Sequence, residues 1–339
     1  MMQQDNLLID PLPKPIKPKI SYLGQFGILI ALVGVGVLLA GAIQFAFILP
    51  SLGKVRADAK MEQNIMNLLS DPSKADMLRW MQLLSAFAMF FLPVLVFALI
   101  ISRKALPYLG FNRLISNKQI LYVIGIALLA LVASMALGDL NAMLPIPKDW
   151  VTKFKAMEEL YNKQIMAIAR MSNFGEYIFV MVVIALAPAI FEEALFRAGL
   201  QQLLTNWTKR PIIAIIVTSF LFSIVHGSFY GFLPRMALGV VLGFIFYYSK
   251  NIWLSILMHF LNNGISITAF FYYSQKGKPV KEAMDANISS IYGNIVGLLM
   301  GALAIAGLVT LLKYFRNESR KLPAVDTINY LKTDDNPFA

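Results

Sequence analysis

The amino-acid sequence predicts an all-α polytopic membrane protein with about eight transmembrane helices. Of its 339 residues, 58% are hydrophobic, and the mean hydropathy of +0.65 is higher than a soluble domain of this length would have. The apolar residues form runs of about 20, which is the length that crosses a hydrocarbon core of about 30 Å. Because these runs are continuous rather than alternating, they exclude a transmembrane β-barrel.

The charged residues favour membrane lipid as a partner. The net charge is +11, from 30 Lys and Arg against 19 Asp and Glu, and basic loops bind an anionic membrane surface. The basic residues are scattered and form no stripe with interleaved aromatic residues, so we expect no nucleic-acid partner. The chain has no cysteine, which excludes disulfides, a thiolate nucleophile and cysteine metal sites.

The N-terminal half is predicted to hold a tail and the first membrane helices. Residues 1–21 form a polar tail rich in Pro and Lys, which lacks the features of a cleavable signal. Residues 22–174 hold three spans followed by an amphipathic helix whose large side chains recur at helical spacing, typical of a helix that lies in the membrane interface. The expected spans are 24–49, 80–101 and 120–137, and the interfacial helix is 149–172.

The C-terminal half is predicted to hold a catalytic membrane core over residues 175–273. One further membrane helix lies within 274–315, and 316–339 is a second polar tail. An even number of spans places both termini on one side, together with the short basic loops at 103–104 and 209–210. The positive-inside rule then predicts cytoplasmic termini in a bacterial cytoplasmic membrane. The expected spans are 176–208, 211–226, 232–248, 252–273 and 291–315.

Ionisable residues lie inside the apolar segments of this core. Glu192, Glu193 and Arg197 fall within six residues of each other, and both histidines of the chain, His226 and His259, are also surrounded by apolar residues. Each charged group in such a position costs roughly 2.5–3.5 kcal/mol on insertion scales. Ionisable residues that persist inside a membrane usually have a function, so these five are candidate site residues.

The depth of these residues in the membrane allows them to meet. Glu192 lies about 17 residues before the turn at 209–210, and His226 lies about 16 residues after it. With a rise of about 1.5 Å per residue, two antiparallel helices bring the two side chains to similar heights. His259 lies nearer the middle of the bilayer, so a kink or a tilted helix must make up the difference.

Helical spacing groups the candidates further. Glu193 and Arg197 are four residues apart, as are His259 and Asn263, so each pair shares one face of a helix. The first pair is interpreted as structural support within the membrane. Phe222 precedes the first histidine by one turn and is expected to pack over the site.

These residues carry a resemblance to a known family. Glu192-Glu193-x-x-x-Arg197, Phe222-x-x-x-His226 and His259-x-x-x-Asn263 resemble the three motifs of the CAAX protease and bacteriocin-processing (CPBP) family of intramembrane endopeptidases. The resemblance covers about residues 175–268. It implies a CPBP-like intramembrane protease core that hydrolyses a peptide bond of a membrane-associated peptide or protein.

The resemblance also implies a role for each residue. Glu192 would be the general base that takes a proton from water, and His226 would help to position that water. His259 and Asn263 would stabilise the oxyanion of the scissile carbonyl.

Metal dependence stays open at this stage. The sequence lacks His-Glu-x-x-His, and a catalytic zinc site normally has three protein ligands and a water. Glu192, His226 and His259 could supply three ligands for a divalent metal such as zinc. We favour the scheme without a metal and assign no cofactor.

Other function classes remain as alternatives. The same fold could serve as a non-catalytic scaffold or a bacteriocin-immunity-type protein that binds a peptide without cutting it. A proton-coupled transporter is less favoured, because the first three spans carry no intramembrane acid and no inverted repeat is visible. Ser223 lies one turn from His226, but the Gly-x-Ser-x-Gly pattern of a serine hydrolase is missing.

Overall fold

The computed structural model describes residues 18–52, 61–112, 114–278, 294–323 and 330–331. The predicted tails at 1–21 and 316–339 lie partly outside these residues, as does the predicted start of the last span at 291. Within the described ranges the regular structure is helical, apart from one isolated β-bridge between Ser102 and Leu331. The all-α prediction is confirmed.

Seven helical segments of the described chain are long and apolar enough to cross a membrane. Two of them, 72–101 and 174–208, combine several shorter elements, because π-helical turns interrupt the α-helix. The elements are α1 (Tyr22–Leu52), α2 (Met61–Leu69), η1 (Pro72–Lys74), α3 (Ala75–Ala86), η2 (Phe87–Phe91), α4 (Leu92–Ile101), α5 (Ala105–Tyr108), α6 (Asn117–Ala142), α7 (Lys148–Ile168), α8 (Phe174–Val180), η3 (Met181–Leu186), α9 (Ala187–Glu193), η4 (Ala194–Gln201), α10 (Gln202–Thr208), α11 (Pro211–Ile224), α12 (Phe232–Ser249), α13 (Ile252–Gln275) and α16 (Asn294–Ser319).

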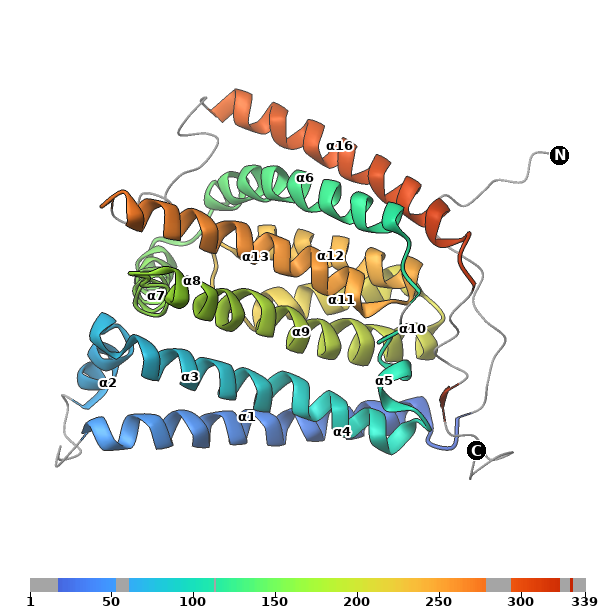
Figure 1. Ribbon diagram of the computed structural model, residues 1–339, viewed down its shortest axis with the longest axis horizontal. Helices are drawn as coiled ribbons and strands as arrows, with labels where there is room; N and C mark the ends of the chain where they lie inside the picture. The colour runs from blue at the N-terminus through green and yellow to red at the C-terminus, as the bar shows by residue number, and fades with distance from the viewer. Residues whose placement is uncertain (1–17, 53–60, 113, 279–293, 324–329, 332–339) are drawn as a thin grey trace.

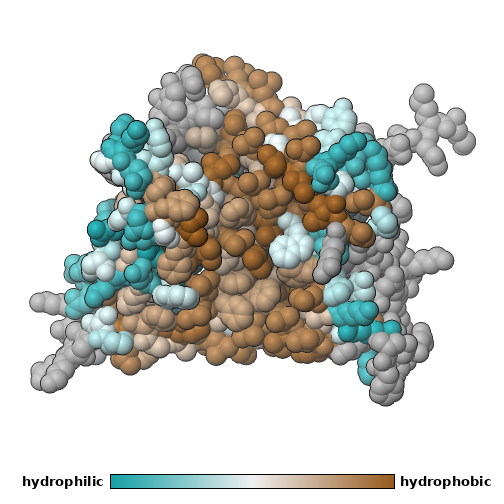
Figure 2. All heavy atoms as spheres, in the orientation of Figure 1, coloured by the Kyte–Doolittle hydropathy of each residue, from teal (hydrophilic) through white to brown (hydrophobic). Residues whose placement is uncertain are grey.

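The arrangement of these helices fits a bilayer. The long apolar helices run roughly parallel to one another in Figure 1, whereas α7 is seen nearly end-on, and the start of α1 lies at the same end of the molecule as the end of α16. Figure 2 shows a broad hydrophobic band between two hydrophilic ends. Many large apolar side chains in this band are exposed, including Leu38, Leu121 and Leu303. The chain is therefore an integral membrane protein whose apolar outer face contacts lipid.

The predicted fifth span is shorter than expected. It was predicted over 211–226, but α11 has only 14 residues and ends at Ile224. At about 1.5 Å per residue it covers about 21 Å, less than the hydrocarbon thickness of about 30 Å. The helix stops where the Ser223 hydroxyl donates a hydrogen bond of 2.7 Å to the carbonyl of Phe232, at the start of α12. His226 therefore lies in a turn inside the apolar band.

Among the other predicted boundaries that move, three have a clear local reason. The second span begins at 72 rather than 80, because the Asp71 carboxylate caps the backbone N–H of Ser73 at 2.8 Å. The interfacial helix α7 ends at Ile168 rather than at 172, where the buried Arg79 donates to the Ile168 carbonyl at 3.0 Å. The last helix continues past 315 to Ser319, whose hydroxyl accepts a hydrogen bond from Gln119 of α6.

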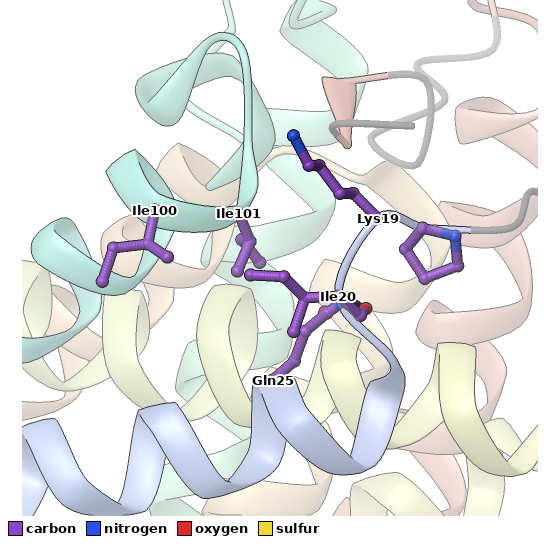
Figure 3. A pocket seen from close by; sticks show the side chains of 6 residues that line it. Lys19, Ile20, Gln25, Ile100 and Ile101 are labelled. Carbon is purple, nitrogen blue, oxygen red and sulfur yellow. Dashed lines mark hydrogen bonds between the residues drawn. The ribbon is translucent and has the colours of Figure 1, made fainter. Parts of the chain in front are cut away.

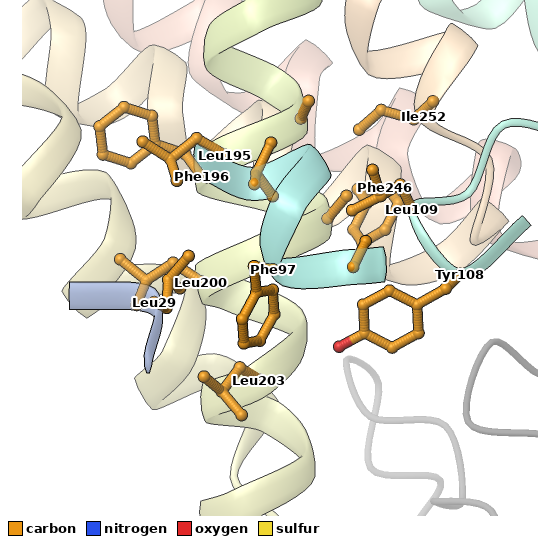
Figure 4. Close-up of a cluster of buried hydrophobic side chains, with 14 of the residues drawn as sticks. Leu29, Phe97, Tyr108, Leu109, Leu195, Phe196, Leu200, Leu203, Phe246 and Ile252 are labelled. Carbon is orange, nitrogen blue, oxygen red and sulfur yellow. The ribbon is translucent and has the colours of Figure 1, made fainter. Parts of the chain in front are cut away.

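The main hydrophobic core lies where α1, α4, η4 and α12 meet. Leu29, Phe97, Phe196 and Phe246 are among its buried side chains, as Figure 4 shows. It encloses the C-terminal part of the segment that carries the two glutamates, and it includes Ile252 and Ile256 of α13.

Glycine lets α11 and α12 approach closely, as the small-residue pattern of the sixth span predicts. A Cβ added at Gly239 would lie 2.9 Å from Ser219, and one at Gly243 would lie 2.8 Å from Ile215. This tight hairpin fixes the turn between the two helices, and that turn carries His226.

Candidate active site

The two glutamates lie on one α-helical turn between two π-helical segments. Pro188 lies in the first turn of α9, and Glu192 and Glu193 end it. The π-helical segment η3 precedes this short helix and η4 follows it. Each π-turn inserts a residue and rotates the following side chains, and such turns are frequent at functional sites.

Glu192 faces both histidines of the chain. Its Oε2 atom lies 3.8 Å from Nε2 of His226 and 3.9 Å from Nε2 of His259. Both distances are too long for direct hydrogen bonds, and this oxygen is buried without a hydrogen-bond partner among the described residues. The side chain of Glu192 keeps 11% of its surface exposed and that of His226 keeps 24%, so the cluster can be reached from outside.

Glu193 points into a closed environment instead. It is fully buried, with Oε2 at 3.1 Å from Nε of Arg197 and Oε1 at 3.1 Å from Nδ1 of His259. The expected pair with Arg197 is therefore present. The second contact was not predicted: Glu193 joins the arginine to the imidazole of the last motif.

Both imidazoles are held in the same way. Nδ1 of His226 lies 2.7 Å from the carbonyl of Phe222, which can only accept, so Nδ1 carries the proton. Nδ1 of His259 donates to the Glu193 carboxylate in the same fashion. Each ring thus turns Nε2 toward Glu192, and the partner of Nδ1 sets the tautomer, as is usual for functional histidines.

Phe222 lies at the centre of the cluster, as the sequence predicts. Its ring centroid is 4.8 Å from that of His226 and 5.9 Å from that of His259, and the Arg197 guanidinium lies over its face at 5.2 Å. Phe196 packs against it edge-on at 5.3 Å. Phe222 therefore covers the ion pair of Glu193 and Arg197 and packs against both imidazoles.

Asn263 lies one turn beyond His259 on α13 but makes different contacts. Its Nδ2 atom donates to the carbonyl of Ile184 in η3 at 3.3 Å, and its Oδ1 atom accepts from Asn262. The side chain is only partly buried. The Asn263 amide therefore donates a hydrogen bond to a backbone carbonyl of the π-helical segment η3, and within the described part of the chain it forms no hydrogen bond with Glu192 or the histidines.

A comparison with protein-family models now identifies this region. Residues 174–265 match the model described as Rce1-like, type II CAAX prenyl endopeptidase. The chain carries an Rce1-like domain. The comparison with curated proteins gave no match, and neither did the comparison with solved structures.

The Rce1-like domain contains every residue of the three motifs. It runs from α8 to the middle of α13, close to the 175–268 that the motif resemblance covers. Its family is one of proteases, which agrees with a hydrolase and with the predicted CPBP resemblance. The helices α1 to α7 and α16 lie outside it and pack around it.

A pocket of about 200 Å³ lies outside the Rce1-like domain. Lys19, Ile20, Gln25 and Ile101 are among its lining residues, as Figure 3 shows, and none of the motif residues lines it. The site assignment therefore rests on the contacts of the motif side chains.

The serine alternative does not fit the geometry. The hydroxyl of Ser223 donates to the Phe232 carbonyl at 2.7 Å, and the side chain is 1% exposed. Ser223 is thus a buried structural residue that joins the ends of α11 and α12.

Proposed function

We propose that the chain is an intramembrane endopeptidase in which Glu192 activates water. One observation carries this proposal: an unpartnered carboxylate oxygen lies between two imidazole nitrogens at 3.8 and 3.9 Å. Polar groups separated by more than 3.5 Å can be bridged by a water that hydrogen-bonds to each of them. A water held there would meet a base and two polar side chains inside a low-dielectric region.

The proposed reaction uses the arrangement of each side chain. Glu192 takes a proton from the water while the water oxygen attacks the scissile carbonyl. Glu192 later delivers that proton to the leaving amine. His226 orients the water through Nε2, because its Nδ1 is already bound to a carbonyl.

The oxyanion would be stabilised from α13. His259 donates from Nε2 when its ring carries both protons, and the carboxylate of Glu193 at 3.1 Å stabilises that charged form. Asn263 lies on the same helix face and would donate its amide after leaving the Ile184 carbonyl. Glu193 and Arg197 act as support in this scheme.

The proposal keeps the scheme without a metal, and two observations support it. No group of three His, Asp or Glu side chains among them is arranged to hold a metal ion. Ligands of tetrahedral zinc at about 2.0–2.1 Å would lie roughly 3.3 Å apart, closer than the 3.8 and 3.9 Å between Glu192 and the imidazoles. The proposed steps therefore run without a metal, and a chelator tests this point.

The proposed substrate is a membrane-associated peptide or protein. The family model is described by its action on CAAX prenyl substrates, and a lipid-bearing peptide suits a site within the apolar band of Figure 2. Such a substrate would be concentrated in the plane of the bilayer and would reach the cluster from the membrane.

Cleavage of a prenylated peptide in proteoliposomes tests the proposal. We expect the wild-type protein to cleave, and Glu192→Gln to lose about two to four orders of magnitude in turnover. Glu159→Gln is the matched control, since Glu159 is an exposed residue of α7 that pairs with Lys163, and it should cleave normally. Excess chelator should leave the wild-type rate unchanged.

Two outcomes would contradict the proposal. Equal turnover by the wild-type protein and Glu192→Gln would remove the assigned base. Binding of the peptide without any cleavage by the wild-type protein would instead support the scaffold or immunity alternative.

A further inference from the structure

Asn141 is a fully buried polar side chain near the end of α6. It lies outside the Rce1-like domain. Its Nδ2 atom donates a hydrogen bond of 2.8 Å to the carbonyl of Phe229, and its Oδ1 atom accepts one of 3.0 Å from the backbone N–H of Leu233. Because a carbonyl can only accept and an N–H can only donate, these partners fix the orientation of the amide. Both ends of the side chain therefore bind the backbone of another segment.

The backbone that Asn141 binds belongs to the turn between α11 and α12. Residues 225–231 connect the two helices, and His226 is the second of them. Phe229 lies three residues further on, and Leu233 lies in the first turn of α12. Asn141 thus holds the chain on both sides of the point where α12 begins, and it ties that point to α6.

The start of α12 is capped from α6. Gly231 is the N-cap residue of α12 and has no side chain that could accept a hydrogen bond from the first turn. The N–H of Leu233 is one of the first-turn groups without a partner in its own helix, and Asn141 supplies its acceptor. Asparagine suits this position because it offers a donor and an acceptor at once, whereas aspartate lacks the donor and leucine lacks both.

Two other side-chain contacts hold the same turn less directly. Ser223 donates to the Phe232 carbonyl, but Ser223 belongs to α11 itself, so this bond joins the two ends of the turn to each other. Ser228 donates to the carboxylate of Glu158 at 2.7 Å, and that carboxylate is on a partly exposed side chain of α7. Asn141 differs from both, because it binds two backbone groups from a separate and buried position.

The place of this turn matters for the proposed chemistry through His226. Its Nε2 atom lies 3.8 Å from Oε2 of Glu192, and a water can bridge such a gap only while both groups keep their positions. A misplacement of about 1 Å can cost about 10²-fold in rate. Glu192 belongs to a helix, whereas His226 belongs to a connecting turn, so the imidazole depends more on contacts from other segments.

We propose that Asn141 is a positioning residue, which fixes the turn that carries His226 and thereby sets the distance between His226 and Glu192. The inference rests on the proposed function, and it assigns Asn141 no chemistry of its own. It extends the working parts of the site beyond the matched domain, since α6 lies outside residues 174–265.

A double-mutant cycle on turnover tests this role. Cleavage of the prenylated peptide is measured in proteoliposomes with enzyme in excess, and rates are expressed per folded molecule. Asn141→Ala should lower the rate by roughly 10- to 100-fold, as expected for a displaced reacting group. In a His226→Gln background the same change should alter the rate by no more than about twofold, because the imidazole that Asn141 positions is already absent.

Gln119→Ala is the matched control. Gln119 is a buried amide at the other end of α6, and it donates to the hydroxyl of Ser319 in α16 at 3.0 Å. Gln119→Ala and Asn141→Ala should both lower the thermal stability in detergent, because each leaves buried polar groups without a partner. The rate per folded molecule should fall for Asn141→Ala and stay at the wild-type value for Gln119→Ala.

The outcomes separate this inference from the proposed function. If the wild-type protein cleaves the peptide and Asn141→Ala lowers the rate by the same factor in both backgrounds, Asn141 acts on the whole structure and the inference is wrong. It is also wrong if Asn141→Ala keeps the wild-type rate. If the wild-type protein cleaves nothing, both proposals fail. Should Asn141→Ala not fold, Asn141→Ser takes its place in the same cycle, with the same results deciding.

Discussion

The two sides of the short helix α9 give neighbouring carboxylates opposite surroundings. Glu193 is fully buried, and each of its oxygens has a partner at 3.1 Å. Glu192 keeps part of its surface exposed, and its Oε2 has no partner closer than the 3.8 Å to His226. One side is a closed ion pair that extends to an imidazole, and the other is an open site.

This difference follows from helix geometry. Successive residues of an α-helix are turned by about 100°, so two identical side chains can serve different purposes one position apart. A paired buried carboxylate is costly to disturb, whereas a carboxylate without a partner is free to act on a ligand. The comparison predicts that changes on the Glu193 side reduce stability and that changes on the Glu192 side reduce turnover.

The largest effect on stability should come from Glu193→Gln. It leaves Arg197 as an unpaired buried cation, which costs about 3–5 kcal/mol, whereas Glu192→Gln should leave the stability nearly unchanged. Thermal unfolding in detergent, followed for both variants, measures the contrast. The double variant Glu193→Gln, Arg197→Gln should lose less than the sum of the two single changes; additive losses would show that the pair is not coupled.

Phe222→Leu should have a smaller effect, and it should lower both the stability and the turnover. Phe222 packs against both imidazoles and against Arg197, so the smaller side chain leaves a cavity costing about 1–2 kcal/mol. Turnover should also fall, because His226 and His259 lose the ring that fixes them. A loss of stability with full activity would mean that Phe222 serves only the closed side.

The smallest effect is expected from Ser223→Ala. It removes the donor to the Phe232 carbonyl and should cost about 1 kcal/mol. Peptide cleavage should persist within a few-fold of the wild-type rate, since Ser223 takes no part in the proposed chemistry. A complete loss of cleavage in a protein of normal thermal stability would revive the serine alternative.

Much of this site could be predicted from the sequence. Counting residues from the turn at 209–210 placed Glu192 and His226 at similar depth, and the structure has them 3.8 Å apart. The four-residue spacing of Glu193 and Arg197 likewise corresponds to their observed contact. Both predictions depend on the rise per residue and the number of residues per turn, which are nearly the same in every α-helix.

The remaining contacts depend on rotations that periodicity does not encode. The π-helical segments η3 and η4 shift the helix faces on either side of α9, so the contact between Glu193 and His259 could not be derived from an ideal period. The early end of α11 and the packing of α7 on the turn were missed because they rest on contacts between distant segments, such as that of Glu158 with Ser228.

The short helix α11 has a consequence for the lipid beside it. Its outer face exposes Ile213, Ile216 and Phe220, yet about 21 Å of helix falls roughly 9 Å short of a typical hydrocarbon core. The acyl chains next to it must compress, at a cost of fractions of a kcal/mol for each ångström of hydrophobic mismatch. The turn that holds His226 follows the end of this short helix, so we expect bilayer thickness to affect its position, and shorter acyl chains should reduce the mismatch.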